Sequence, residues 1–250
     1  EVFCGRARYS PPDNGVRIDA IRDGIDDLYA GSPLRPLLLT SLLEAADRVD
    51  ATVGVQMAFL KQYPPRALRP LRLRAPVLTP GRGTAVRADA QAHVATMPSV
   101  DLAYLDPPYN QHRYFTNYHV WETLVRWDAP EHYGIACKRV DARDDATRSA
   151  FNSRRTIHAA LADTIAQVRA EVVVVSFSDE GLVGIDDVVA FCAARGGAVR
   201  GLAFDSRRYV GSTIGVYSPA GVKGGQAGRS RNTEVLVLGG SEDRLRAMGD

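Results

Sequence analysis

The sequence has few cysteines and no long apolar run, and these two absences exclude several protein classes. Its 250 residues include three cysteines, Cys4, Cys137 and Cys192, an odd number placed far apart. That spacing is neither a disulfide framework nor a zinc-ligand pattern, which suits a reducing cytosol. No stretch approaches the length of a membrane span, and no charged-then-apolar signal peptide opens the chain. We therefore expect a cytoplasmic protein without a membrane partner.

The net charge is close to zero, but the charges are unevenly distributed. The formal net charge is +2. The stretch from Lys61 to Arg87 contains cations and no acid, and the stretch from Arg200 to Arg231 contains a single acid, Asp205. Clustered cations of this kind favour phosphate contacts, although solvated basic loops give the same pattern. The candidate nucleic-acid contacts are Lys61, Arg66, Arg207 and Arg208.

The expected secondary structure divides the chain into a helical region, residues 1–80, and a region of alternating strands and helices, residues 81–250. Helical spacing of apolar residues gives three helices in the first region: Asp19–Tyr29, Leu37–Val49 and Val53–Leu60. The strands expected in the second region are Thr84–Ala88, Val100–Leu105, Val172–Phe177, Ala198–Phe204 and Glu234–Leu238. The helices expected there are Asn117–Trp127, Thr147–Arg169 and Asp186–Arg195. This alternation predicts an α/β, Rossmann-like fold with a mainly parallel sheet.

The most informative motif is Asp106-Pro107-Pro108-Tyr109, which follows the apolar strand Val100–Leu105. Ligands of open α/β sheets bind at the carboxyl ends of the strands, where this motif would lie. A carboxylate, a proline-stiffened carbonyl and a flat ring together suit an exocyclic amine on a planar base. The alternative is a strand that ends in a Pro-Pro turn beside a half-buried tyrosine.

The residues that follow make the motif more specific. The stretch from Asp106 to Leu124 reads Asp-Pro-Pro-Tyr-Asn-Gln-His-Arg-Tyr-Phe-Thr-Asn-Tyr-His-Val-Trp-Glu-Thr-Leu. It resembles the catalytic segment of bacterial adenine-specific (N6) DNA methyltransferases of restriction–modification systems. The resemblance implies S-adenosylmethionine as cofactor and double-stranded DNA as substrate, with a cognate restriction endonuclease as a further partner. It also implies a place near the nucleoid, and it makes residues 1–80 the DNA-recognition region.

The resemblance assigns roles to individual residues. Asp106 and the Pro107 carbonyl would accept from the amine of a flipped adenine on which Tyr109 stacks, with Asp106 also beside the cofactor. Asp89 would contact the adenine of the cofactor, although this residue alone reads as a helix N-cap. In the loop after the motif, Asn110 and Arg113 would contact DNA, whereas a surface ion pair is the alternative for the arginine.

Metal chemistry is not expected. His119 and Glu122 lie three residues apart on a predicted helix, but no third ligand is evident, and a structural role is the better interpretation. Methyl transfer from a sulfonium needs positioning and electrostatics rather than a metal.

One part of the family pattern is missing, the Phe-x-Gly-x-Gly turn that approaches the cofactor. Phe3-Cys4-Gly5 imitates its beginning, but no strand precedes it and Pro11-Pro12 follows where a helix should start. We therefore expect an incomplete sheet.

Two alternatives to a DNA adenine methyltransferase stay open. The first is a DNA-binding partner subunit that has lost cofactor binding, as the missing turn suggests. The second is a methyltransferase that acts on RNA or on protein amines, although Asp106 speaks against the protein-glutamine enzymes.

Overall fold

The computed structural model describes residues 1–57, 62–207 and 231–249. The chain forms two compact units, each discontinuous in sequence: Glu1–Arg82 with Tyr114–Thr147, and Gly83–Arg113 with Arg148–Asp250. We call them the helical unit and the α/β unit. The sequence interpretation assigned Tyr114–Thr147 to the α/β region, but this segment packs in the helical unit. Among the described residues, no helix is both long enough and apolar enough to cross a membrane.

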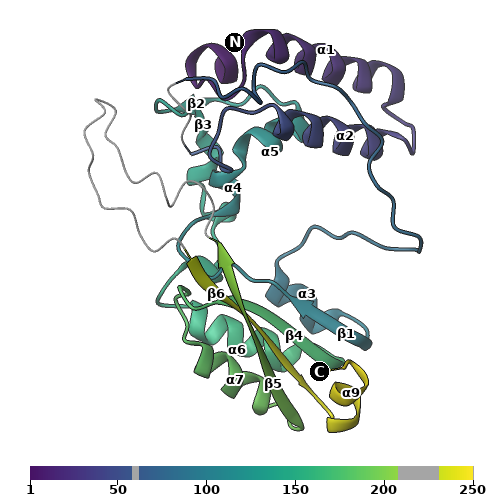
Figure 1. The fold of residues 1–250 in the computed structure, drawn as a ribbon, viewed down its shortest axis with the longest axis vertical. Helices are drawn as coiled ribbons and strands as arrows, with labels where there is room; N and C mark the ends of the chain where they lie inside the picture. The colour runs from purple at the N-terminus through teal and green to yellow at the C-terminus, as the bar shows by residue number, and fades with distance from the viewer. Residues whose placement is uncertain (58–61, 208–230, 250) are drawn as a thin grey trace. The chain divides into compact units, whose positions relative to one another are not determined.

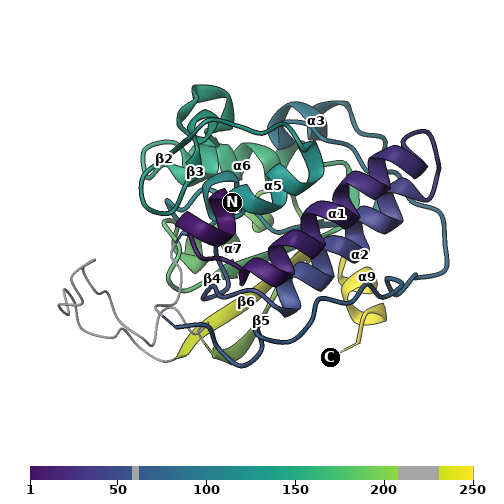
Figure 2. The same cartoon turned by 90° about the horizontal axis from the view of Figure 1, so that it is seen from above.

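Two antiparallel helices dominate the helical unit, α1 (Pro12–Tyr29) and α2 (Arg35–Arg48), which lie side by side (Figures 1 and 2). The smaller elements of this unit are the π-helical turn η1 (Val2–Arg6), α4 (Tyr114–Asn117), α5 (His119–Arg126), the strand pair β2 (His132–Tyr133) and β3 (Lys138–Arg139), and the 3-10 turns η2 (Val140–Arg143) and η3 (Asp145–Thr147). The helix expected over Val53–Leu60 is not formed over residues 53–57, where the Gln56 N–H donates to the Asn117 carbonyl, and residues 58–60 lie outside the described chain.

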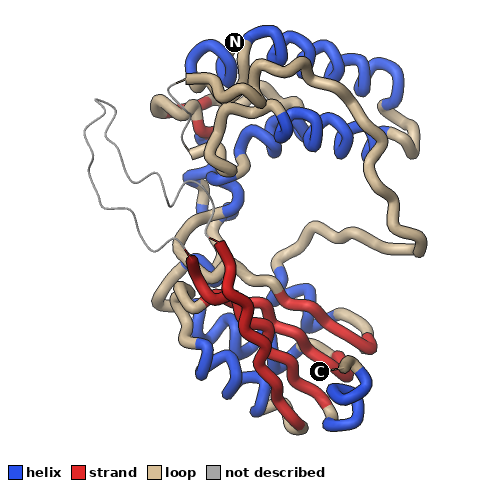
Figure 3. The backbone as a smooth tube through the Cα atoms, viewed as in Figure 1, coloured by secondary structure: helices blue, strands red, loops and turns tan. Residues whose placement is uncertain are grey.

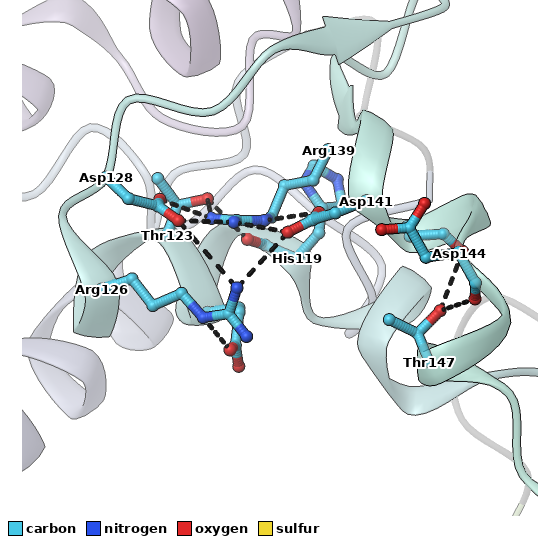
Figure 4. Close-up of polar contacts among 10 residues, drawn as sticks. His119, Thr123, Arg126, Asp128, Arg139, Asp141, Asp144 and Thr147 are labelled. Carbon is cyan, nitrogen blue, oxygen red and sulfur yellow. Dashed lines mark hydrogen bonds and ion pairs between the residues drawn. The ribbon is translucent and has the colours of Figure 1, made fainter.

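The segment after α5 is held in the helical unit by one buried arginine. The Arg139 guanidinium donates to both carboxylate oxygens of Asp128, at 2.7 and 2.6 Å, and to those of Asp141, at 2.9 and 2.7 Å. It also donates to the hydroxyl of Thr123 on α5, so it joins α5 to β3 and η2 (Figure 4). The Arg139 side chain is 2% exposed, and its hydrogen bonds lower the pKa of both carboxyl groups.

The α/β unit is built on a four-stranded sheet in the order β1-β4-β6-β5 (Figure 3). The strands are β1 (Val100–Leu105), β4 (Ala170–Ser178), β5 (Ala198–Arg207) and β6 (Arg231–Gly240). The helices are α3 (Ala90–Thr96), α6 (Ile157–Gln167), α7 (Ile185–Ala193) and α9 (Glu242–Ala247), with the 3-10 turn η4 (Ala150–Asn152) before α6. The predicted α/β class is confirmed.

The strand directions refine the prediction of a mainly parallel sheet. The β1–β4 pairing is parallel, whereas β6 pairs antiparallel with both β4 and β5. It follows that β1, β4 and β5 point the same way and that the reversed strand β6 is inserted between two of them. Parallel direction was therefore predicted correctly for three strands, but two of the three pairings are antiparallel.

Two other expectations fail in this unit. Residues 84–88, expected as a strand, are an exposed extended segment without a sheet partner in the described chain. The expected helix Thr147–Arg169 is regular only as α6, because Asn152 and its neighbours turn back to contact the loop that follows β1.

Alternate residues of β4 divide the core of the α/β unit. Val173, Val175 and Phe177 pack with α6 and α7 in the main cluster. Val172 and Val174 point to the other face, where Leu245 of α9 covers them. On that second face, the neighbouring side chains of β1 and β5 stay exposed: Leu102, Tyr104, Leu202 and Phe204. Burial is therefore more extensive on the face that α6 and α7 cover than on the other.

Candidate active site

The Asp-Pro-Pro-Tyr motif begins directly after β1, as the sequence predicts. Leu105, the last residue of β1, is paired with Val175 of the central strand β4, which fixes the point where the motif starts. Asp106 is exposed, and in the described part of the chain no donor contacts its carboxylate. Pro107 and Pro108 are half-buried. The carboxylate is therefore held at a strand end and is available to a ligand.

Tyr109 is anchored against the core of the same unit. Its ring lies edge-on to that of Phe177, with the centroids 6.2 Å apart and the planes at 70°. Its carbonyl accepts from the Leu182 N–H at 2.7 Å. Tyr109 is half-buried, so part of the ring is accessible.

Leu182 belongs to the connection between β4 and α7, residues 179–184, which the sequence analysis did not single out. A Cβ on Gly181 would lie 2.3 Å from the Phe177 ring, so only glycine allows this close approach. The available sequence signal was the pair Gly181 and Gly184 between a predicted strand and a predicted helix. Tyr109 is therefore supported on two sides, by Leu182 of this connection and by Phe177 of β4.

The loop after Tyr109 is held by one amide, that of Asn152. Its Nδ2 donates to the carbonyls of Asn110 and His112, at 2.8 and 3.0 Å. The Asn110 side chain accepts from the His112 N–H at 2.9 Å, which closes a local turn. Arg113, half-buried, ends this part of the α/β unit. No local sequence pattern indicates this role of Asn152, because its partners are backbone groups 42 and 40 residues away.

Asp89 caps helix α3. Its Oδ1 accepts from the Ala92 N–H at 3.0 Å, which confirms the N-cap interpretation. The side chain is exposed, and the cap uses one of its two oxygens. No hydrogen bond joins Asp89 to Asp106 in the described chain, so the structure does not bring the two predicted cofactor-binding carboxylates into contact.

The predicted DNA-binding cations differ in how far the structure describes them. Arg66 forms an ion pair with Asp50 at 2.8 Å and donates to the Thr52 carbonyl at 2.7 Å, so a structural role occupies its guanidinium. Arg207 ends β5, and its side chain is outside the described atoms. Lys61 and Arg208 lie outside the described residues.

The glycine-containing segment near the N-terminus has a structural role. Gly5 lies in the π-helical turn η1, and Phe3 packs with Tyr9 and His119 in the helical unit. This is not a strand–turn–helix, and the sequence contains no Phe-x-Gly-x-Gly elsewhere. His119 is buried, with its Nε2 2.9 Å from the Gln56 carbonyl, and burial lowers its pKa to about 4. Glu122 forms an ion pair with Arg126, so His119 and Glu122 both have the structural contacts that the sequence interpretation expected.

Comparison with known proteins supports the interpretation of the Asp-Pro-Pro-Tyr motif. Residues 7–172 match the family model of the D12 class N6 adenine-specific DNA methyltransferases. The chain is 30% identical to the modification methylase LlaI of Lactococcus lactis over 72% of this chain and 30% of that protein. It is 30% identical to the type II methyltransferase M.NlaIII of Neisseria lactamica over 72% of this chain and 54% of that protein. It is 31% identical to M.CviAII of Paramecium bursaria Chlorella virus 1 over 77% of this chain and 57% of that protein.

The matched region therefore spans between about a third and somewhat over half of these relatives' lengths. No solved structure matches the chain. The family model covers well over half of the residues, and its match includes the whole Asp106–Arg113 loop. The chain belongs to the D12 class of N6 adenine-specific DNA methyltransferases.

Proposed function

We propose that this chain carries the target-base part of a DNA adenine-N6 methyltransferase and acts on double-stranded DNA. The observation that carries the proposal is the exposed carboxylate of Asp106 at the end of β1, beside an anchored Tyr109. Membership of the D12 class supports adenine as the target base.

The chemistry that Asp106 would perform follows from the electronic structure of adenine. The lone pair of the N6 amine is delocalised into the purine ring and is a weak nucleophile. Acceptance of both amine hydrogens, by Asp106 and the Pro107 carbonyl, would favour a pyramidal nitrogen with a localised lone pair. The two prolines keep the carbonyl in place without offering a competing N–H donor. The protein therefore contributes positioning and electrostatics to the reaction.

Tyr109 would provide the surface on which a flipped adenine stacks. An enzyme that modifies a base atom must take the base out of the duplex. The edge-on contact with Phe177 fixes the tyrosine ring, so that its accessible part can receive the base without reorganisation. Asn110 and Arg113, in the loop after Tyr109, would contact the adjoining DNA, and the Asn152 hydrogen bonds to the Asn110 and His112 carbonyls support a fixed loop.

The proposed cofactor is S-adenosylmethionine, which supplies a methyl group activated by the positive charge of its sulfur. The chain fits this cofactor in part. Asp106 offers a carboxylate without a partner in the described chain, and Asp89 has one oxygen left after capping α3. Either group can accept from an amine. The glycine turn that would receive the methionine part of the cofactor is absent from this sequence.

Residues 1–80, with the Tyr114–Thr147 segment that packs beside them, would form the DNA-recognition region. Arg66, Arg207, Lys61 and Arg208 remain candidates for phosphate contacts, although the Asp50 ion pair weakens the case for Arg66. In a bacterial cell, a DNA substrate would place the protein in the cytoplasm near the nucleoid, with a cognate restriction endonuclease as its functional partner.

The absent glycine turn favours one second candidate, a DNA-binding partner subunit that does not bind the cofactor. Isothermal titration with S-adenosylmethionine, followed by transfer of tritium from the labelled cofactor to duplex DNA, separates the two. The methyltransferase proposal predicts cofactor binding and label in the DNA. DNA binding without detectable cofactor binding would assign this chain to the second candidate.

A further inference from the structure

The helical unit contains a hollow of about 290 Å³ whose charged lining is wholly basic. It lies between the C-terminal end of α2 and the extended segment that includes Pro70. The lining residues are Ala45, Arg48, Val49, Arg69, Pro70, Arg72 and Arg74. We call this feature the arginine groove. It does not overlap the Asp-Pro-Pro-Tyr loop, which belongs to the other unit.

Two polar side chains of the helices fix the extended wall of the arginine groove. Asn14 of α1 is buried; its Nδ2 donates to the carbonyls of Ala67 and Arg69, at 3.0 and 2.8 Å, and its Oδ1 accepts from the Leu71 N–H at 2.9 Å. Ser41 of α2 donates to the Arg74 carbonyl at 2.6 Å and accepts from the Arg74 N–H. The backbone that carries the arginines is therefore held at both ends.

Burial of one residue in this segment turns its neighbours outward. Leu71 is 6% exposed and packs with Ala45, Ala46 and Val49 of α2. The flanking residues Arg69, Arg72 and Arg74 are exposed. The apolar contact thus sets which side chains face solvent, so the arginines are presented by a packed scaffold.

The charges of the arginine groove are largely uncompensated. Arg48 forms an ion pair with Glu44 at 2.7 Å, one turn earlier on α2. In the part of the chain that the structure describes, no acid pairs with Arg69, Arg72 or Arg74. Arg66, only three residues before Arg69, does have an acidic partner. Three of the four arginines in the lining thus lack an acidic partner in the described chain, and an anionic ligand would find uncompensated positive charge there.

We propose that the arginine groove binds the phosphodiester backbone of duplex DNA. A guanidinium group can donate two parallel hydrogen bonds to two oxygens of one phosphate. This geometry makes its binding more specific than that of the lysine ammonium group. Phosphate contacts set the register of a protein on the duplex and carry no base information, which fits a site that offers arginines and apolar side chains only. The inference rests on the proposed function for the nature of the anion and adds the place where it is held.

The test compares two triple variants of the full chain that lose the same charge. The first is Arg69→Gln, Arg72→Gln and Arg74→Gln. The matched control is Arg143→Gln, Arg154→Gln and Arg155→Gln, which removes three exposed arginines that lie outside the Lys61–Arg87 stretch and lack an acidic partner in the described chain. Affinity for a labelled duplex of mixed sequence is measured by fluorescence anisotropy over a series of salt concentrations.

Each lost phosphate contact lowers the slope of log affinity against log salt by about one, so the groove variant should lower it by about three. Its affinity at moderate salt should fall about 10- to 100-fold, equally on any duplex sequence. The control should change both quantities far less. A charge-preserving triple Arg→Lys variant should retain most of the affinity.

The outcomes separate the two proposals. If the unaltered chain binds duplex and transfers methyl groups but the groove variant binds as tightly as the control, the arginine groove proposal is overturned and the proposed function stands. If the unaltered chain does not bind duplex, both are overturned. Thermal unfolding checks that the variants fold. If the groove variant does not fold, Arg72→Gln alone must lower the slope of log affinity against log salt by about one.

Discussion

Charged groups hold the Tyr114–Thr147 segment of the helical unit, whereas neutral groups hold the Asp106–Arg113 loop of the α/β unit. In the helical unit, Asp128 and Asp141 share the Arg139 guanidinium, and Asp26 is paired with Arg22 at 2.7 Å. In the α/β unit, the loop that carries Asp106 is held by neutral groups, the Asn152 amide and the Leu182 N–H. The carboxylate at its tip has no partner in the described chain. The carboxylates of Asp128 and Asp141 thus fix structure, whereas the Asp106 carboxylate remains available for chemistry.

The largest effect, on the rate of methyl transfer, should come from neutralising the Asp106 carboxylate. Asp106→Asn should lower the rate of methyl transfer about 10³-fold, or about 4 kcal/mol in the barrier, because the amide cannot accept from the adenine amine as the carboxylate does. Single-turnover methylation measures this rate. Asp101→Asn, which changes another exposed aspartate of β1, is the matched control and should keep the activity. An equal loss in both variants would point to a structural effect.

A smaller effect, on stability alone, should come from breaking the charge network of the helical unit. Arg139→Met should lower the free energy of unfolding by about 3 kcal/mol, because it leaves two carboxylates without their buried partner. Arg126→Met, whose side chain is 32% exposed, should cost less than about 1 kcal/mol. Urea unfolding measures the cost, and hydrogen exchange should show faster exchange in the helical unit only. Faster exchange of β4 would contradict the division into units.

The helical unit should also lose stability in mild acid. Burial lowers the folded-state pKa of His119 from 6.5 to about 4, so the unfolded chain takes up this proton first as the pH falls. The free energy of unfolding should be undiminished above about pH 6.5 and should fall by about 3 kcal/mol towards pH 4. Unfolding titrations in His119→Phe should lack this slope, whereas His93→Gln should keep it. A slope that survives in His119→Phe assigns it to another group.

The smallest effect should come from removing the Asn152 hydrogen bonds that hold the loop after Tyr109. Asn152→Asp has the same size but loses both hydrogen bonds to the Asn110 and His112 carbonyls, so kcat should fall about tenfold while the KM for DNA changes little. Ser149→Ala removes the N-cap of the same 3-10 turn but keeps the Asn152 hydrogen bonds, so it should leave kcat unchanged. A change confined to KM would show that Asn152 acts on DNA binding instead.

What could be predicted from the sequence was mainly local. The strand Val100–Leu105 was predicted with the observed boundaries, because an apolar run that ends at a Pro-Pro turn is a local signal. The helix expected over Asn117–Trp127 is instead divided into α4 and α5. The strand expected at Thr84–Ala88 had apolar residues of the right type but finds no neighbouring strand in the described chain. Pairing depends on the rest of the sheet, which local pattern does not contain.

The remaining errors concern partners that are distant in sequence. Arg66 and Arg69 look alike in a basic run, but Asp50, 16 residues earlier, pairs with Arg66. Asn152 and Leu182 donate hydrogen bonds to backbone carbonyls of Tyr109 and the loop after it. The spacing of residues along the sequence cannot reveal such contacts. The Tyr114–Thr147 segment reads as a continuation of the α/β region, yet the apolar face of α5 packs on α2 in the helical unit.

The proposed function requires that the chain direct a methyl group to the N6 amine of adenine in duplex DNA. Mass spectrometry of nucleosides released from DNA after incubation with the full chain and S-adenosylmethionine tests it most directly. The account predicts N6-methyladenine as the methylated nucleoside, formed by the unaltered chain and reduced about 10³-fold with Asp106→Asn. Methylated cytosine, or N6-methyladenine at an undiminished level with Asp106→Asn, would contradict it.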